Sequence, residues 1–393
     1  MDLDFRSDII YANQLDTIKF AKMLDDPSQC YKFYWLEAIL NLITITDEDI
    51  SFDQIINEMI CEAWHSVTCY HLHLGPTIKD KSENFLEHAV KIVELDPELP
   101  QPATKSDIMA AIARNDSKLK SDKNNLTNYV PYRLLSSFLD ELRGSDKIWD
   151  QHRRLIAYIS EFDKRKDLLY TIVDDVGLKK KVHVNENWKR LIFDNYSILK
   201  SWIQLKKIHF LQDRNPGVPG IIYKLLPEND NSRKVNNARE LWKCAVDISR
   251  EPIFDIYSNM QLNMKRFDLD HFVPWSYIAN DELWNLIPME KSLNSSKNNK
   301  LPSWDLYFKK MAERQYQLYK IIYKFKEVQK QFEKCRRDNL NAIWASETLY
   351  IQGNTEEQFM NILEHNLRPL YDSACLQGYH IWKLPEFKIS TLL

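Results

Sequence analysis

One short stretch of the chain carries an Asp-His pair and two spaced asparagines. Asp270 and His271 follow a run suited to a β-strand, and Asn285 opens a second apolar run that would return antiparallel to the first. Asn294 and Lys297 lie three residues apart, which on a helix places both side chains on one face. Carboxylate and amide oxygens suit a hard divalent cation, and an imidazole can take a proton from water near neutral pH. The stretch therefore predicts metal-assisted hydrolysis of a phosphodiester.

The spacing of these residues resembles the HNH, or ββα-metal, nuclease family. In that family a hairpin and the helix after it hold one divalent cation. The Asp-x-Asp-His start, the fourteen-residue step from His271 to Asn285 and the nine-residue step to Asn294 are similar to the HNH domain of RNA-guided CRISPR effectors. The resemblance covers roughly residues 260–315 and leaves the rest of the chain without an assigned chemistry.

The resemblance implies a role for each polar residue. His271 is expected to act as the general base that takes a proton from the attacking water. Asp270 and Asn294 are expected to hold Mg²⁺, with Mn²⁺ as a substitute, and Asp268 either contacts the ion or lies beside it. Asn285 is expected to support catalysis by bonding the backbone across the loop, which would fix the angle of His271.

Three lysines complete the expected site. Lys297 is placed to hold a nonbridging phosphate oxygen as a point charge, and Lys291 and Lys300 are further candidates for binding the substrate. The alternative for the whole stretch is a polar hairpin with an ordinary buried histidine and turn-forming asparagines. The number of positions that agree with one mechanism favours the nuclease.

The cysteines argue against a structural zinc ion. Many HNH proteins carry two Cys-x-x-Cys pairs around the catalytic unit, whereas the six cysteines of this chain are scattered singly. Cys61, His65 and Cys69 share a helical face and could imitate a metal site, but their apolar neighbours favour a helix in a core. No structural zinc is expected, and unpaired cysteines agree with a reducing cytoplasm.

Composition narrows the class of protein. The 393 residues include 12% aromatics and only 7 glycines, which favours an ordered, packed protein of two or three domains. The N-terminus has no apolar signal region, and no window approaches eighteen uninterrupted apolar residues. Neither export nor membrane spanning is indicated, so a cytoplasmic location is expected.

Charge is segregated along the chain. Residues 1–60 hold four Lys or Arg against twelve Asp or Glu, whereas residues 291–337 hold thirteen Lys or Arg against four acidic residues. A basic segment beside the expected site suits contact with DNA phosphates, although such runs are usually solvated helix faces. The acidic end would avoid DNA or bind a basic partner.

The expected fold is mainly α with a small α+β unit. Residues 1–215 form a helical recognition or partner-binding region with a sub-boundary near 115–128, residues 216–340 an HNH domain with a long following helix, and residues 341–393 a C-terminal helical extension. Helices are expected over 9–45, 51–72, 84–96, 146–163, 188–212 and 239–249, and a long helix with an apolar stripe is expected to begin at Ser303. A polar helix over 103–127 is expected to run into the loop SKLKSDKNNLTN. A hairpin is expected from 168–173 with 180–184, and an extra strand over 253–257.

These features together predict a cytoplasmic, Mg²⁺-dependent DNA endonuclease in restriction or antiphage defence. One site cuts one strand, so a double-strand break would need a homodimer, a second nuclease or two successive nicks. The apolar stripe after Ser303 is either core or a dimer seam. Two alternatives remain: a nuclease subunit that is silent until a partner protein of a defence system activates it, and an RNA-cleaving toxin.

Overall fold

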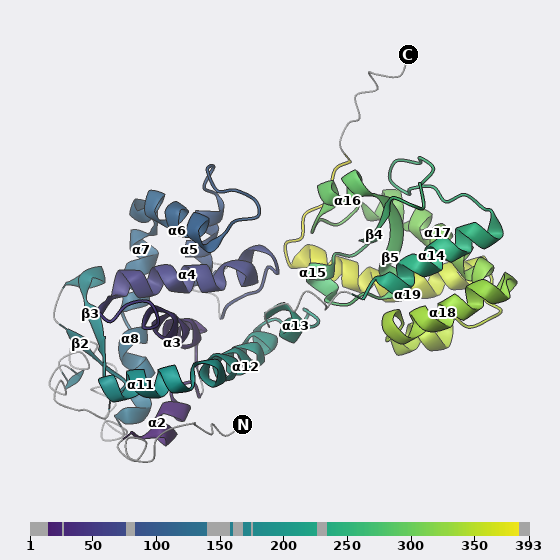
Figure 1. The fold of residues 1–393 in the computed structure, drawn as a ribbon. Helices are drawn as coiled ribbons and strands as arrows, with labels where there is room; N and C mark the ends of the chain where they lie inside the picture. Colours follow the sequence, from purple (N-terminus) through teal and green to yellow (C-terminus); the bar gives the residue numbers. More distant parts are fainter. Residues whose placement is uncertain are drawn as a thin grey trace. The chain divides into compact units, whose positions relative to one another are not determined.

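The computed structural model describes residues 15–25, 27–75, 83–139, 158–159, 168–173, 176–225 and 234–384. The chain divides into two compact units, Met1–Pro216 and Gly217–Leu393, coloured from purple to teal and from teal through green to yellow in Figure 1. Within the described ranges, no helix is long and apolar enough to cross a membrane. The described part of the chain is mainly helical and contains two small sheets, which confirms the expected mainly α fold with a small α+β unit.

The first unit is built from helices, several of which begin with a polar side-chain cap. Ser51 and Gln54 form a capping box at the start of α4, and Asn84 and Glu87 form one at the start of α5. The described elements are α2 (Thr17–Lys22), α3 (Tyr31–Leu42), β1 (Ile50–Ser51), α4 (Phe52–Thr68), α5 (Phe85–Glu94), α6 (Lys105–Arg114), α7 (Asp116–Thr127), α8 (Val130–Arg133), η1 (Leu134–Phe138), β2 (Tyr170–Val173), η3 (Gly177–Lys179), β3 (Lys181–Val184), α11 (Glu186–Asp194) and α12 (Tyr196–Arg214).

Three expectations for this unit were wrong in detail. The range 9–45, expected to be helical, holds two separate helices in its described part, α2 and α3, and residues 9–14 and 26 lie outside the described residues. The expected loop SKLKSDKNNLTN belongs to α7, because Leu119 and Leu126 lie on one face and are buried. The single helix expected over 188–212 is interrupted at Asn195, whose amide donates to the carbonyl of Leu191 at 2.9 Å. Most of the helix expected at 146–163 lies outside the described residues.

The hairpin expected in this unit is present. Strands β2 and β3 pair antiparallel, with Tyr170 opposite Val184 and Val173 opposite Lys181. The sequence did not reveal a third strand, β1, which pairs with β3 through Ile50 and Val182. Two residues cannot be recognised as a strand from periodicity.

The second unit surrounds a two-stranded sheet with helices. Its hairpin, β4 and β5, is followed directly by the short helix α16. The elements are α13 (Ile221–Leu225), α14 (Asn236–Ser249), β4 (Phe267–His271), α15 (Trp275–Ile278), η4 (Leu283–Asn285), β5 (Leu286–Glu290), α16 (Lys291–Lys297), α17 (Trp304–Lys324), α18 (Lys326–Asn339), η5 (Ala345–Leu349) and α19 (Glu356–Leu376).

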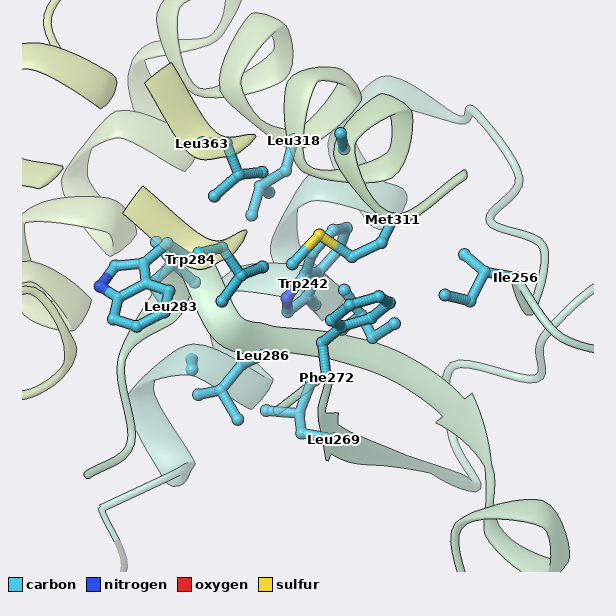
Figure 2. Packing of buried hydrophobic residues seen from close by; sticks show 14 of the residues in the cluster. Trp242, Ile256, Leu269, Phe272, Leu283, Trp284, Leu286, Met311, Leu318 and Leu363 are labelled. Carbon is cyan, nitrogen blue, oxygen red and sulfur yellow. The ribbon is translucent and has the colours of Figure 1, made fainter. Parts of the chain in front are cut away.

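A single hydrophobic core joins the hairpin to these helices. Trp242 of α14, Leu286 of β5, Met311 of α17 and Leu363 of α19 belong to it and are fully buried (Figure 2). Residues of the last part of the chain therefore pack in the same core as the hairpin. Burying apolar surface of this kind stabilises a fold by roughly 25 cal/mol per Å².

For the second unit, one open alternative is decided and two expectations are wrong. The apolar stripe that begins after Ser303 is core, because its members from Trp304 to Ile322 are buried within the chain, so it offers no free dimer seam. The helix also ends at Lys324, and α18 begins at Lys326. The strand expected over 253–257 is a turn with one isolated bridge between Phe254 and Gln261.

Candidate active site

The β4–β5 hairpin places the Asp-His pair at the end of a strand. Asp270 lies opposite Ile287 and His271 opposite Leu286 in the antiparallel register. Helix α16 starts directly after β5, and the Glu290 side chain caps it by accepting from the backbone amide of Leu293 at 3.0 Å. The Glu290 carboxylate also accepts from the Ser292 hydroxyl. This hydrogen bond first of all, and those from the backbone amides of the helix start, lower the pKa of Glu290. The cap fixes the direction in which α16 returns toward the Asp-His pair.

Hairpin and helix enclose a small polar pocket of about 170 Å³. Asp270, His271 and Asn294 all contribute to its wall. The lining is completed by Leu269, Pro274, Trp275, Ser295, Asn298 and Asn299. The structure thus brings together the expected base and both expected metal ligands.

The donor atoms at this pocket suit a hard divalent cation. The carboxylate of Asp270 and the amide of Asn294 supply oxygen atoms, and the Asn294 side chain makes no hydrogen bond to any part of the chain that the structure describes. Two protein ligands would leave most coordination positions for water and phosphate. Among the described residues, no three His, Cys, Asp or Glu side chains form a metal-binding group. The donor set of this pocket would suit a divalent cation held weakly.

Both oxygens of Asp270 already have hydrogen-bond donors. The Tyr257 hydroxyl donates to Oδ2 at 2.8 Å, and the Lys297 ammonium donates to Oδ1 at 2.8 Å. Burial, together with the nearby charge of Asp270, raises the pKa of Tyr257 well above its usual value, so the phenol stays a donor. Each carboxylate oxygen has a second lone pair, which leaves Asp270 able to bind a cation.

Lys297 is fully buried rather than pointing into solvent. Its Nζ donates to Asp270 Oδ1 and to the backbone carbonyl of His271, both at 2.8 Å. The expected contact of this lysine with a phosphate oxygen is therefore not the contact seen in the structure. In this position the ammonium ties the last turn of α16 to the end of β4.

His271 has a partner that sequence reasoning missed. Its Nε2 lies 2.8 Å from Oδ1 of Asp281, and both side chains are buried. Asp281 follows Asn280 in the loop between α15 and β5, ten residues after the histidine. An acidic residue in a loop carries no distinctive spacing, so no motif pointed to it. A carboxylate beside an imidazole is a recurrent arrangement for orienting a catalytic or metal-binding histidine.

Asn285 closes the loop that holds these residues. Its side-chain oxygen accepts from the backbone amide of Val273, and its side-chain nitrogen donates to the Val273 carbonyl, both at 2.8 Å. The backbone amide of Phe272 also donates to the Asn285 carbonyl at 2.9 Å. Asn285 is completely buried. It therefore shapes the backbone next to His271 and does not line the pocket.

The remaining expected residues lie at the edge of the site. Asp268 forms an ion pair with Arg239 of α14 at 3.5 Å and is not among the described residues that line the pocket. Lys291 and Lys300 are exposed at the two ends of the α16 region. Other basic side chains of segment 291–337 are exposed on α17 and α18, namely Lys309, Lys320, Lys324, Lys326, Lys330, Lys334, Arg336 and Arg337.

Residues 380–382 form hydrogen bonds with the end of α16 and with the residues that follow it. Leu301 donates its backbone amide to the carbonyl of His380 at 2.9 Å, and its carbonyl accepts from the amide of Trp382 at 2.6 Å. These bonds form a parallel bridge between Leu301 and Ile381. The Trp382 indole also donates to Ser296 Oγ at 3.3 Å. The end of α16 is therefore anchored by residues about eighty positions later in the chain.

The alternative metal cluster in the first unit is part of a packed helix. Cys61, His65 and Cys69 lie along α4 and its end, and Cys69 Sγ lies 3.5 Å from His65 Nδ1. Burial raises the pKa of Cys61 to about 12, which disfavours the thiolate that zinc requires. This environment suits a core helix.

Comparison with known proteins identifies the same stretch. Residues 255–303 match the HNH endonuclease family, and this range spans the hairpin, α15 and α16. No curated protein and no solved structure matches the chain. The C-terminal half of the chain therefore contains an HNH domain, which supports a nuclease and accords with the spacing in the sequence. HNH nucleases generally use a divalent metal.

Proposed function

We propose that this chain is a Mg²⁺-dependent endonuclease that hydrolyses phosphodiester bonds in DNA, one strand per active site. The observation that carries the proposal is the pocket shared by Asp270, His271 and Asn294, formed by a hairpin and helix that match the HNH endonuclease family. Mn²⁺ would substitute for Mg²⁺, because both are hard cations that accept carboxylate and amide oxygens.

The residues divide the chemistry among them. Asp270 and Asn294 would hold the cation, which when bound neutralises charge on the phosphate and assists the departing oxygen. His271 would take the proton of the attacking water, a role that suits an imidazole with a reference pKa of about 6.5. Asn285 would keep the backbone around Val273 in the shape that presents the histidine to the pocket.

The substrate and cellular setting rest on broader features. Exposed basic side chains on α17 and α18 would attract a nucleic acid, and Lys291 and Lys300 flank the pocket helix. We place the enzyme in the cytoplasm, in phage defence or restriction, by resemblance to HNH proteins that carry large additional domains. The first unit would then select the target or bind a partner protein of that system.

One observation favours a nuclease that is silent until a partner activates it. The expected metal ligand Asp270 is already paired with the buried Lys297 ammonium. A cation entering the pocket would meet a carboxylate whose charge is balanced, which weakens metal binding. In that case a partner that shifts α16 would raise metal affinity and with it the rate of cleavage.

Nicking of supercoiled plasmid DNA with Mg²⁺ tests the proposal. We expect the parent protein to cut, and His271→Ala to lower the rate on the order of 10² to 10⁴, the usual contribution of a general base. His365→Ala, an exposed histidine on α19, is the matched control and should cut like the parent. Equal rates for parent and folded His271→Ala would overturn the assignment.

The same assay separates the alternatives. A parallel digestion of tRNA should be slower than that of plasmid, and the reverse order would replace the DNA enzyme with an RNA-cleaving toxin. Cleavage by the purified protein alone would contradict the hypothesis of a nuclease that is silent until a partner activates it. Cleavage only after a partner is added would support that hypothesis. EDTA should abolish either activity, and added Mg²⁺ or Mn²⁺ should restore it.

A further inference from the structure

The carboxylate of Asp281 is held between two hydrogen-bond donors. Oδ1 lies 2.8 Å from His271 Nε2, and Oδ2 accepts the backbone amide of Lys234 at 2.7 Å. Asp281 and His271 are both buried, so water does not compete strongly for these oxygens. We propose that Asp281 is a positioning residue, which fixes the tautomer and orientation of His271. This inference rests on the proposed function, in which His271 is the base.

The chemistry of the two groups determines where the imidazole proton lies. An ionised carboxylate only accepts hydrogen bonds, so His271 Nε2 must carry a proton to bond Asp281. A neutral imidazole with its proton on Nε2 has an unprotonated Nδ1. That nitrogen is then the atom able to take a proton from water in the pocket that His271 lines. Asp281 thus determines which of the two ring nitrogens of His271 acts as the general base.

Asn339, the last residue of α18, holds the loop that carries Asp281. Its side-chain nitrogen donates to the backbone carbonyls of Asp281 and of Lys234, both at 2.7 Å. Asn339 is completely buried, and its side-chain oxygen accepts from the thiol of Cys335 at 3.6 Å. The side-chain amide of Asn339 therefore fixes both the segment that carries Asp281 and the segment of Lys234, whose amide bonds the Asp281 carboxylate. The orientation of His271 depends in this way on a residue 68 positions later in the chain.

Asp281→Asn tests the proposal with little change of shape. The Lys234 amide needs an acceptor, so the new side-chain oxygen should turn toward it and the new NH₂ group should face His271 Nε2. Nε2 must then accept, which moves the proton of the neutral ring to Nδ1. The ring would keep its place but present a protonated nitrogen to the pocket. In serine proteases, the change from aspartate to asparagine at the catalytic Asp-His pair inverts the histidine tautomer in this way and lowers kcat about 10⁴-fold.

The tautomer itself is the first measurement. In full-length protein labelled with ¹⁵N-histidine, at a pH where the ¹⁵N shifts themselves show a neutral ring, we expect the His271 signals of the Nε2–H form. The His271→Ala spectrum identifies these signals. Asp281→Asn should exchange them for the Nδ1–H form, while Asp372→Asn, an exposed aspartate on α19, should leave them unchanged. The Nδ1–H form in the parent protein would overturn the proposal, and this result does not depend on whether Asp281→Asn folds.

Kinetics provide the second measurement. Asp281→Asn should lower kcat for plasmid nicking on the order of 10² to 10⁴. The Kd for DNA, measured with Ca²⁺ in place of Mg²⁺, should stay within about twofold, because phosphate contacts rather than the histidine determine binding. A folded Asp281→Asn protein with parental kcat would overturn the proposal. If the parent protein cuts no nucleic acid, the proposed function fails, and the tautomer measurement still decides the role of Asp281.

Discussion

The ammonium nitrogen of Lys297 lies 2.8 Å from a carboxylate oxygen of Asp270, and both side chains are buried. Two charges removed from water stabilise each other only as a pair, because each is costly to bury alone. The pair joins the last residue of α16 to the fourth residue of β4. The expected metal ligand is thus held in place by a cation of the chain itself.

Lys297→Met should lower the free energy of unfolding by about 3 to 5 kcal/mol, because it leaves a buried carboxylate without its counter-charge. Urea denaturation followed by circular dichroism measures this loss. Adding Asp270→Asn removes the orphaned charge, so the double variant should be more stable than the sum of the two single losses by about 0.5 to 3 kcal/mol. Strictly additive losses would show that the two groups do not interact. Lys300→Met, exposed nearby, should change stability by less than about 0.5 kcal/mol.

Asn285→Ala should destabilise the second unit by about 1 to 3 kcal/mol for each backbone group of Val273 that it leaves unpaired. Asn285→Asp should be at least as unstable as the alanine variant near neutral pH, since its carboxylate would be buried without a counter-charge and one of its oxygens would face the Val273 carbonyl. Thermal denaturation ranks the three proteins. An aspartate variant that is clearly more stable than the alanine variant would contradict this expectation.

Asn294→Ala should weaken Mn²⁺ binding by an order of magnitude or more, because it removes one of two proposed protein ligands. Isothermal titration calorimetry in the absence of DNA gives the affinity directly. Asn299→Ala is the matched control, since Asn299 lines the same pocket and offers the same amide group. Loss of binding in Asn299→Ala with parental binding in Asn294→Ala would move the ligand assignment from one asparagine to the other.

Lys224 should make stability depend on pH. Burial lowers the pKa of this lysine to about 7, whereas an unfolded lysine titrates near 10.4. Between about pH 7 and pH 10 the unfolded chain therefore holds a proton that the folded chain lacks, and stability from this group rises with pH. Below about pH 7 both states are protonated and the contribution is at its lowest. Lys224→Met should remove the dependence, measured by urea denaturation at about pH 6, 8 and 9.5.

A constant difference between parent and Lys224→Met over this range would contradict the prediction. The lysine donates to the carbonyls of Pro219 and Tyr277, so a change in its charge would also affect the end of α15. Lys309→Met, at an exposed lysine on α17, controls for the loss of a positive charge alone.

The local parts of the site could be predicted from sequence. Asp270, His271, Asn285 and Asn294 lie within 25 residues, and their positions on strand and helix follow from spacing. The β4–β5 register and the start of α16 agree with that spacing. Short-range geometry of this kind depends little on the rest of the fold.

The long-range parts could not be predicted. Asp281 meets His271, and Asn339 meets Asp281, only because α18 packs beside the loop before β5. Burial likewise decided the position of Lys297, which spacing alone would place facing a phosphate. The helical conformation of SKLKSDKNNLTN in α7 was missed for a related reason. Two leucines among polar residues give only a weak helical periodicity.

The bridge between Leu301 and Ile381 sets an order of events during protein synthesis. The residues that anchor the end of α16, His380 and Trp382, leave the ribosome about eighty residues after Leu301 does. Until then the nascent hairpin and its pocket helix lack this support, while the first unit can already fold. A cell making this protein would therefore acquire a fully supported pocket only after residue 382 has been synthesised.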